Sequence, residues 1–408
     1  MQPMRRESPY PMVPIEEARR IIATRVAPLP AEEVDSLAAD GRVLAEDVFA
    51  DEDMPDVPKA GVDGYALRAA DEMAERRVLA ELTAGGAASV ALEPGTAARI
   101  MTGAPLPDGA DAVIMVEQTE EDHGLLRIRQ AVRAGGGVQV VGQDVARGDL
   151  VLPRGTALGP AEIGLLATVG RVRVRVHRRP IVAVLATGDE VYEPDAPASR
   201  GGIRDSNRYT LLAAAREAGC ATISLGIARD DAAVQRQAIL AGIERADVLL
   251  TSGGVSMGTR DLVKPLLAEL GTVHFGRVAF KPGKPTTFAT VREKLVFGLP
   301  GFPVSSLVSF EVFVRPALRL LQGDARPERA RVRVSLDEPI VAAPDRPEYQ
   351  RAIVAWEDGR LRARSTGSQS SSRLLSLRGA NALLLVPADG RVHAAGDELD
   401  ALLIGPLR

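Results

Sequence analysis

The sequence predicts a multidomain protein of the α/β plus β class, with a parallel-sheet α/β domain, a β-rich insert before it and a compact β-domain at the C-terminus. Between residues 180 and 322, short apolar runs alternate with helical stretches, which is typical of a parallel sheet covered on both faces. Residues 46–148 and 326–408 contain short β-like runs separated by Gly and Pro instead.

Length and composition exclude several classes. The chain has 408 residues, 46% hydrophobic and 25% charged, which leaves room for roughly two to four domains. A net charge of −4 gives no overall basic footprint for nucleic acid, so any anion site must be local. Cys220 is the only cysteine and the four histidines are scattered, which excludes a disulfide framework and disfavours a Cys or His metal cluster. Without a signal-peptide core or a membrane-spanning run, we expect a cytoplasmic protein that binds neither membrane nor nucleic acid.

The first 180 residues read as short helices and strands. Apolar residues spaced by three and four predict a helix over 15–26, opened by Pro14, and a second short helix is expected over 33–45. The insert should hold strands near 78–82, 97–101, 112–118 and 125–129. A helix over 160–169 precedes a strand over 172–176, where Val and Arg alternate. That alternation favours a half-buried strand with a solvated arginine face over a nucleic-acid stripe.

The remainder contains the α/β pattern and the C-terminal strands. Strands are expected at 181–186, 222–227, 248–250, 273–277 and 295–299, with helices near 207–218, 232–245, 262–270 and 304–321. The last segment should contribute strands at 331–336, 351–356, 361–364, 382–386 and 399–404.

Five loops follow the apolar runs of the α/β region and are rich in Gly, hydroxyls, carboxylates or lysines. In open α/β sheets, ligands bind beyond the carboxyl ends of the strands. Gly lets backbone N–H groups approach phosphate closely, and carboxylates can carry a hard cation to it. The pattern predicts an anion site built from Thr187-Gly-Asp-Glu190, Arg229-Asp-Asp231, Thr251-Ser-Gly-Gly-Val-Ser256, Lys281-Pro-Gly-Lys-Pro285 and Gly298-Leu-Pro-Gly-Phe-Pro303.

Each motif also has a purely structural interpretation. The segment Asp205-Ser-Asn207 is most simply a helix cap. Asp261 could interact with a helix dipole or ligate magnesium. Taken alone, each motif is weak evidence for a ligand site. Five such loops, each following an apolar run of the same alternating segment, are much stronger evidence.

Together these loops resemble the molybdopterin molybdenumtransferase (MoeA) family, which is related to gephyrin and to plant E domains. The resemblance continues outside the α/β region and spans nearly the whole chain. It rests there on Val62-Asp-Gly-Tyr-Ala66, Arg99-Ile-Met-Thr-Gly-Ala-Pro-Leu-Pro107 and Gly142-Gln-Asp144.

The resemblance implies an architecture and a homodimer. An elongated domain would be assembled from residues 1–45 and 149–179, with the β-rich insert at 46–148 between them. A molybdopterin-binding α/β domain would span 180–325 and a C-terminal β-barrel 326–408. The active cleft would combine the α/β domain of one subunit with the insert of the other.

The resemblance also implies the chemistry. The family inserts molybdenum from molybdate into adenylylated molybdopterin and releases AMP in a Mg²⁺-dependent step; a molybdopterin adenylyltransferase is a possible donor protein. The implied acidic residues for catalysis are Asp63, Asp144, Glu190, Asp231 and Asp261, of which Glu190, Asp231 and Asp261 would hold the metal. The implied nucleotide or pterin contacts are Thr102, Gly188, Ser252, Gly253, Gly254, Ser256, Pro300 and Pro303. The implied molybdate residues are Lys281, Lys284, Ser305, Arg351 and Ser371.

The sequence departs from the family at two places near the expected cleft. Lys59-Ala-Gly-Val62 stands where the family commonly has Asn-Ser-Ala-Met, and Phe302 stands where it usually has Asn. Two other functions stay open: a non-catalytic dimeric scaffold or molybdopterin-binding paralogue, and a CinA-like phosphate-site hydrolase. The second would leave the motifs before residue 110 unexplained.

Overall fold

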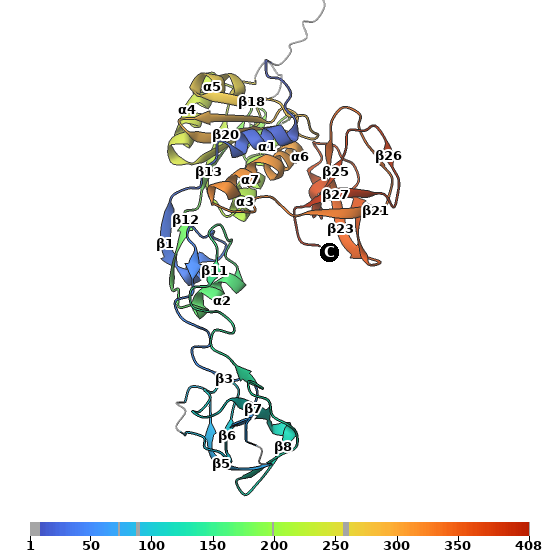
Figure 1. Cartoon of the computed structure of the whole chain (residues 1–408). Coiled ribbons are helices and arrows are strands. Elements are labelled where there is room, and N and C mark those ends of the chain that lie inside the picture. The colour runs from blue at the N-terminus through green and yellow to red at the C-terminus, as the bar shows by residue number, and fades with distance from the viewer. Residues whose placement is uncertain (1–8, 72–73, 87–89, 198–199, 256–260, 408) are drawn as a thin grey trace, which may run out of the picture.

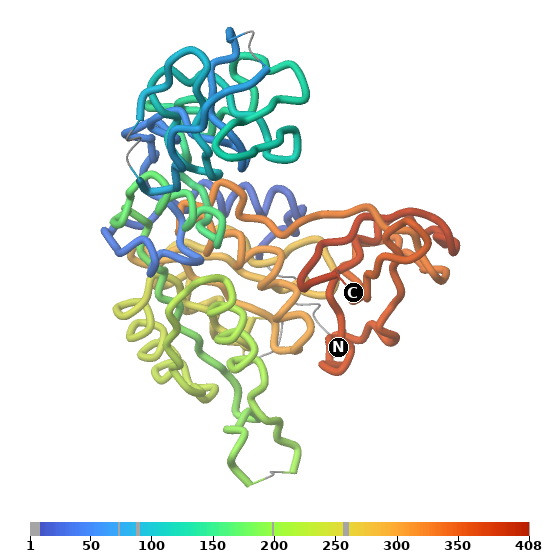
Figure 2. The backbone as a smooth tube through the Cα atoms, turned by 90° about the horizontal axis from the view of Figure 1, so that it is seen from below, coloured from blue at the N-terminus to red at the C-terminus, as the bar shows by residue number. Residues whose placement is uncertain are grey.

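A computed structural model of the chain describes residues 9–407 apart from 72–73, 87–89, 198–199 and 256–260. The molecule is elongated, with an α/β domain and a barrel at one end, a narrow stem, and a β-rich insert at the other end (Figure 1). Seen from below, the barrel in red lies beside the α/β domain and away from the blue-to-cyan insert (Figure 2). The insert is therefore remote from the sheet of its own chain.

The α/β domain is built on a six-stranded mixed sheet. The first four strands in spatial order are parallel, as the sequence predicts. The outermost strand, near 273–277, was expected as a fifth parallel strand, whereas the strand between it and its expected neighbour was not predicted and runs antiparallel to both. The order is β16 (Ala221–Ala228), β13 (Ile181–Thr187), β17 (Val248–Ser252), β20 (Lys294–Leu299), β19 (Thr287–Val291) and β18 (Thr272–Phe275).

The unpredicted strand β19 leaves the predicted ligand-binding edge of the sheet unchanged. Because β19 is antiparallel to both β20 and β18, strand β18 runs parallel to β20 again. The segment 281–285 therefore leaves β18 and enters β19 at the same edge as the carboxyl ends of β13, β17 and β20. The prediction that the five loops share one edge is compatible with this mixed topology.

Alternate residues of the strands face two separate cores. Val182 and Val184 pack in a cluster with residues of α1 (Ile15–Ala23), α3 (Asn207–Glu217), α6 (Pro303–Ser309) and α7 (Arg315–Leu321). Ala183 and Leu185 pack with residues of α4 (Ala232–Arg245) and α5 (Val263–Leu270). A π-helical turn, Phe310–Val314, joins α6 to α7 where one helix was expected. The N-terminal helix ends three residues earlier than predicted and covers the sheet.

The stem corrects one prediction. Residues 33–45 were expected to form a helix; instead β1 (Ala31–Asp35) is a strand, followed by a 3₁₀ turn, η1 (Ser36–Ala39). Strand β1 pairs antiparallel with the arginine-rich strand β12 (Arg173–His177), and Arg173 bonds Glu33 across the pair. Sheet pairing thus overrides local helix propensity. The stem also contains β2 (Val48–Phe49), β11 (Leu150–Leu152) and α2 (Pro160–Thr168).

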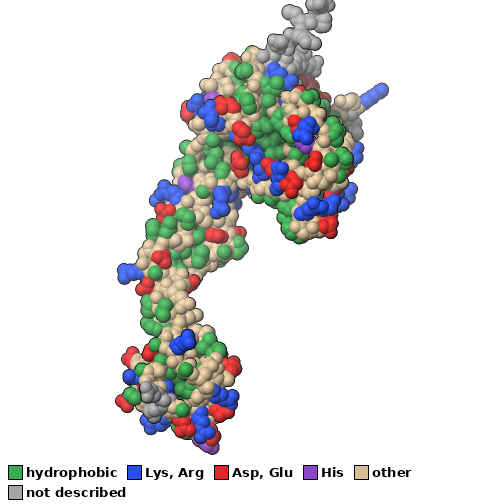
Figure 3. All heavy atoms as spheres, turned by 45° about the vertical axis from the view of Figure 1, so that its right-hand side comes forward, with side chains coloured by type: hydrophobic (Ala, Val, Ile, Leu, Met, Phe, Trp, Pro, Cys, Tyr) green, Lys and Arg blue, Asp and Glu red, His purple; other side chains and the backbone are tan. Residues whose placement is uncertain are grey.

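The strand β12 has the two faces that the sequence predicts. Val174 and Val176 are buried, while Arg173 and Arg175 are exposed. On the face shown in Figure 3, basic and acidic side chains are intermixed, which differs from a continuous basic stripe.

The insert is a second six-stranded sheet, and a glycine sets its closest strand approach. Gly64 begins β4, and a Cβ there would lie 1.9 Å from the carbonyl oxygen of Ile114 on the paired strand β7. Only Gly fits this approach. The spatial order is β7 (Ala112–Met115), β4 (Gly64–Leu67), β6 (Thr96–Ile100), β5 (Glu75–Leu82), β9 (Leu125–Ile128) and β8 (Thr119–Asp122); β3 (Lys59–Ala60) pairs with β10 (Val138–Gln139) beside it.

The C-terminal strands close into a barrel, as the family resemblance implies. Its core includes Val334, Val354 and Leu384. The barrel order is β21 (Arg331–Leu336), β24 (Arg360–Ser365), β23 (Glu348–Glu357), β25 (Ala382–Val386) and β27 (Glu398–Leu403); the remaining pairs are β22 (Ile340–Val341) with β26 (Val392–His393) and, in the α/β domain, β14 (Val191–Tyr192) with β15 (Ile203–Arg204). Within the described residues, every helix is too short or too polar to cross a lipid bilayer.

Candidate functional site

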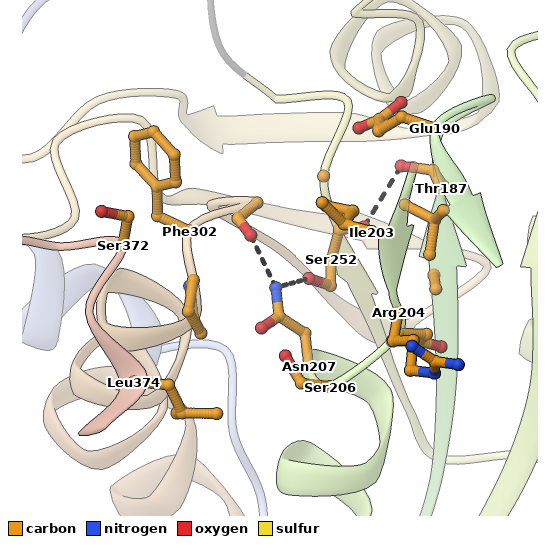
Figure 4. A pocket seen from close by; sticks show the side chains of 16 residues that line it. Thr187, Glu190, Ile203, Arg204, Ser206, Asn207, Ser252, Phe302, Ser372 and Leu374 are labelled. Carbon is orange, nitrogen blue, oxygen red and sulfur yellow. Dashed lines mark hydrogen bonds between the residues drawn. The ribbon is translucent and has the colours of Figure 1, made fainter. Parts of the chain in front are cut away.

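A cavity of about 340 Å³ opens at the carboxyl edge of the sheet, between the α/β domain and the barrel (Figure 4). Three of the five predicted loops contribute to it: the loop after β13, the loop after β17 and the loop after β20. Residues 372 and 374, from the segment between β24 and β25, complete one wall. The cavity is therefore formed jointly by two parts of the chain that are far apart in sequence.

Asn207 holds two of these loops together. Its side-chain amide donates to Ser252 Oγ at 2.8 Å and to the carbonyl oxygen of Gly301 at 2.7 Å (Figure 4). The sequence predicts a helix-capping role for this segment, and Asp205 fills it by accepting from the backbone N–H of Arg208. Asn207 itself faces the cavity, so its role as a cavity residue was missed.

Gly253 lets the loop after β17 contact the end of β13, and Gly188 shapes the loop that follows β13. Gly188 has φ +137°, and a Cβ there would lie 2.7 Å from the carboxylate of Glu190. Gly253 has φ +96°, and a Cβ there would lie 2.7 Å from the carbonyl oxygen of Thr187. Both positions favour Gly for conformation, and at Gly253 the backbone carbonyl of Thr187 also leaves no space for a side chain. The glycines thus allow the tight loop packing that places Glu190 and Ser252 in one cavity wall.

Other predicted contacts lie nearby or outside the described residues. Pro303 lines the cavity and is the first residue of α6, whereas Pro300 is buried. The partly buried Gly254 packs beside Val263. Ser256 falls outside the described residues.

Phe302 stands at the opening of the cavity. Its side chain is 59% exposed, and it precedes α6 without forming a side-chain cap. Leu374 and Ser372 line the same cavity from the barrel side (Figure 4). The lining residues Ile203, Arg204, Ser372 and Leu374 were missed because no motif marks them; the tertiary arrangement alone brings them to the site.

The residues expected to bind molybdate lie apart from the cavity lining. Lys281 Nζ lies 3.1 Å from Glu348 on β23. Ser305 is buried in α6, and the backbone N–H of Val304 donates to the carbonyl oxygen of Ser371. Lys284 is partly buried and forms no ion pair with any other described residue. These residues belong to the loop after β18, to α6 and to the barrel, which all adjoin the carboxyl edge of the sheet.

Arg351 is the most buried cation of this group. It is 0% exposed and donates from Nε to Ser376 Oγ at 3.1 Å and from Nη2 to the carbonyl oxygen of Ser370 at 3.2 Å. Its Nη1 is buried without a partner among the described residues. Burial lowers the pKa of Arg351 to about 10, and Glu348 acts in the opposite direction. A buried cation with an unused donor is suited to an anion.

The three acidic residues expected to bind metal are placed differently. Glu190 lines the cavity, and no other described residue forms an ion pair with it. Asp231 caps α4 by accepting from the backbone N–H of Val234 at 2.9 Å. Asp261 is partly buried just before α5. The described residues contain no group of three or more His, Cys, Asp and Glu side chains that could hold a metal ion. Mg²⁺ is often bound by one or two carboxylates plus substrate phosphates, and Glu190 fits that mode.

Asp63 and Thr102 form a small polar unit in the insert. The carboxylate of Asp63 accepts from both the backbone N–H and the hydroxyl of Thr102 at 2.7 Å. The hydrogen bonds from Thr102 lower the pKa of Asp63. Asp144 is exposed in the same part of the chain, and the insert lies at the far end of the stem from the cavity (Figure 1). The structure of one chain thus places these three residues away from Glu190.

Three family models cover most of the chain. They are the MoeA N-terminal region, comprising domains I and II, over residues 13–170, a probable molybdopterin-binding domain over 183–320, and the MoeA C-terminal region, domain IV, over 333–404. A molybdopterin molybdenumtransferase from Bacillus subtilis is 34% identical over 89% of this chain and 87% of its own length. This chain belongs to the MoeA family.

Other relatives agree with this membership. A gephyrin from Dictyostelium discoideum is 36% identical over 99% of this chain, which spans 64% of the gephyrin's length. A solved structure of the molybdopterin biosynthesis MoeA protein from Pyrococcus horikoshii OT3 has a TM-score of 0.84 and 28% identity, covering 96% of this chain and all of that one. The MoeA fold expected from the motifs is therefore confirmed over nearly the full length.

Proposed function

We propose that this MoeA-family chain is a molybdopterin molybdenumtransferase of molybdenum cofactor biosynthesis. It inserts molybdenum from molybdate into adenylylated molybdopterin and releases AMP. The observation that supports this most strongly is the combination of whole-chain family membership with a cavity at the carboxyl edge of the sheet, lined by Glu190, Ser252 and Gly253. Such an edge is where open α/β sheets bind ligands.

Different residues of the cavity would bind the substrate and the metal ion. Ser252 would contact the adenylylated substrate through its hydroxyl. Asn207 and Gly253 hold this wall in place, because both amide N–H groups of Asn207 donate to Ser252 and Gly301 and the backbone N–H of Gly253 donates to Leu299. Glu190 would hold Mg²⁺, with substrate phosphate oxygens as further ligands. When bound, Mg²⁺ supplies positive charge that stabilises the negative charge of the phosphoryl group under attack. Water attacks the phosphorus, the bond to the pterin phosphate breaks, and AMP departs.

Molybdate would bind beside this wall. Arg351 and Lys281 supply cationic donors, and Lys284, Ser305 and Ser371 lie along the same side of the edge. Arg351 contributes most because its Nη1 is buried without a partner among the described residues. An oxyanion with several acceptor oxygens satisfies such a donor.

The insert would complete the site in a homodimer. Asp63, Thr102 and Asp144 belong to the insert, which lies at the far end of the stem from the α/β domain of its own chain (Figure 1), so a second copy would deliver them. A molybdopterin adenylyltransferase would be the protein that hands over the substrate. A cytoplasmic location stays a prediction.

The test is to mix purified protein with adenylylated molybdopterin, molybdate and Mg²⁺, and to follow AMP and cofactor formation. We expect molybdate-dependent AMP release. Its absence with an intact dimer would favour the scaffold, for which the relation to a gephyrin is the motivating observation. AMP release from unrelated phosphoanhydrides without molybdate would instead favour the CinA-like hydrolase.

A further inference from the structure

A second cavity, of about 660 Å³, lies outside the proposed catalytic site. Its lining contains three carboxylates and six arginines: Arg179, Arg216, Arg315, Arg319, Arg326 and Arg329. The whole chain has a net charge of −4, so this gathering of positive charge is local. A concave wall of one charge concentrates ions of the opposite charge.

Three parts of the molecule meet at this cavity. Arg216 comes from the last turn of α3, and Arg315 and Arg319 come from α7. The segment 322–330 crosses between them, with Ala325 donating to the carbonyl oxygen of Gly155 in the stem at 3.2 Å. At the other end of this segment, the carbonyl oxygen of Ala330 accepts from Leu403 of the barrel at 2.9 Å. The cavity therefore sits at the junction of α/β domain, stem and barrel.

Arg179 shows that this junction is remote from the catalytic cavity. It comes two residues before β13, at the amino edge of the sheet, whereas the catalytic cavity lies at the carboxyl edge. The two cavities share no lining residue.

The carboxylates of the lining are already paired. Asp324 accepts from Arg319 at 2.7 Å, and Glu217 accepts from Arg329 at 2.7 Å. Glu328 lies 3.8 Å from Arg19, which is outside the lining. Two of the three carboxylates are thus neutralised by Arg319 and Arg329 of the same lining, and the third lies near a cation outside it.

Four arginines remain without an ion pair among the described residues: Arg179, Arg216, Arg315 and Arg326. Arg315 is the most enclosed of them, and its Nε is buried without a hydrogen-bond partner. Burial, and then the neighbouring charge of Arg329, lower the pKa of Arg315.

Charges from several arginines act on Cys220, a buried thiol next in sequence to the lining residue Gly219. Burial raises the pKa of Cys220 to about 12, while the charges of Arg319, Arg179 and Arg315 act to lower it. Three guanidinium groups, two from α7 and one from the segment before β13, are therefore close enough to influence one buried thiol. Like charges held together in this way repel unless an anion lies among them.

We propose that this junction cavity binds a phosphate-bearing anion, with a diphosphate as the best-fitting class. The planar fork of Arg matches phosphate oxygens in pairs. Four unneutralised guanidinium groups exceed the charge of a single phosphate, and the cavity has room for a second one. A diphosphate held between α3, α7 and the segment 322–330 ties the barrel linker to the α/β domain. Free pyrophosphate and the diphosphate of a nucleotide share this chemistry.

The test is calorimetric titration of the full-length protein with inorganic phosphate, pyrophosphate and ADP at low salt. The double variant Arg216→Gln/Arg326→Gln removes two exposed, unpaired charges from the rim. We expect its pyrophosphate affinity to fall at least tenfold, and added salt to weaken binding to the unaltered protein. Arg245→Gln is the matched control, since Arg245 also ends a helix but lies outside the cavity. It should leave the affinity unchanged.

A second variant separates this cavity from the catalytic one. Asn207→Ala alters the catalytic wall only, so pyrophosphate binding at the arginines should survive it. Binding that Asn207→Ala abolishes and the double arginine variant retains would overturn the proposal. Inorganic phosphate binding as tightly as pyrophosphate would overturn the diphosphate class. If ADP binds as tightly as pyrophosphate, the cavity recognises the diphosphate group alone. If ADP binds more weakly, free pyrophosphate is the ligand.

Discussion

The guanidinium of Arg178 and the carboxylate of Asp247 form a two-bond ion pair, with both N–O distances 2.7 Å. Asp247 also accepts from the backbone N–H of Ile181 at 2.9 Å. These contacts join the starts of β13 and β17 at the amino edge of the sheet. The ion pair thus ties two strands together at the amino edge, whereas the catalytic cavity opens at the carboxyl edge.

This pair predicts acid sensitivity. Burial acts to raise the pKa of Asp247, but hydrogen bonds from Arg178 and Ile181 outweigh it and lower the pKa to about 2. A carboxylate with a lowered pKa in the folded state contributes stability above its unfolded pKa, and this is lost as pH falls from about 4 to about 2. The loss should be about 2 kcal/mol. Thermal unfolding of Asp247→Asn should show a lower Tm near neutral pH and a weaker acid dependence than the unaltered chain. Asp195→Asn, at an exposed position, should show neither change.

Asn207→Ala should impair turnover more than stability. The change removes the amide that joins Ser252 to Gly301 and so loosens the catalytic wall. We expect AMP release to fall by about 10-fold to 100-fold, since losing a positioning contact costs about 1–3 kcal/mol. Gln237→Ala, at an exposed position on α4, is the control. Full turnover in Asn207→Ala would remove Asn207 from the site.

Phe302→Asn should stabilise the protein. Phe302 is the N-cap residue of α6, with φ −72° and ψ 132°, and its side chain makes no cap hydrogen bond. Pro303 has no N–H and Val304 already donates to Ser371, so an Asn side chain at this position would accept from the backbone N–H of Ser305, which is worth about 1 kcal/mol. The Tm should rise by roughly 2–4 °C in differential scanning calorimetry. Phe302→Ala tests the cause, because it removes the ring without adding a cap and should give no gain.

Glu190→Gln should change the metal dependence of the reaction. Gln keeps the shape of Glu190 but loses the charge that we assign to Mg²⁺. The Mg²⁺ concentration for half-maximal AMP release should rise about tenfold, which corresponds to about 1.4 kcal/mol. Glu357→Gln, on an exposed strand end of the barrel, should leave the Mg²⁺ curve in place. An unshifted curve in Glu190→Gln would exclude this carboxylate as the metal ligand.

Arg351→Gln should weaken the use of molybdate. The substitution removes the buried cation and its unused Nη1 donor. We expect the molybdate concentration for half-maximal cofactor formation to rise at least about tenfold, because charge-assisted bonds contribute about 1.5–3 kcal/mol. Arg364→Gln, on the exposed side of β24, is the control. Equal molybdate dependence in the two variants would contradict the assignment of Arg351.

Particular elements show where sequence reasoning succeeds. The strands β13, β17 and β20 were predictable because each is an apolar run long enough to cross a buried sheet. Their loops were predictable as site loops because topology fixes where parallel strands end. Strand β19 was missed, since Thr287–Val291 follows a Gly-Pro segment and lacks a distinct pattern.

Two predictions were incomplete or wrong because they considered only neighbouring residues in the sequence. A helix was expected over residues 33–45, but the segment 31–35 forms β1, which pairs with β12; Glu33 and its partner Arg173 are 140 residues apart in the chain. Asn207 was read as a cap because local hydrogen bonding is the simplest use of such a residue, and the partner loops were not visible in the sequence. Contacts distant in sequence decide both cases.

The sequence by itself determined the class of the fold, the family and the loops that end the parallel strands, because hydrophobic periodicity and Gly-rich spacing are local properties. Only the tertiary structure decided which side chains share a cavity. It brought Ser372 and Leu374 of the barrel to Asn207, and gathered the arginines of the junction from segments up to 150 residues apart. The physical reason is that charge and shape complementarity arise between surfaces, which form only after the domains have packed.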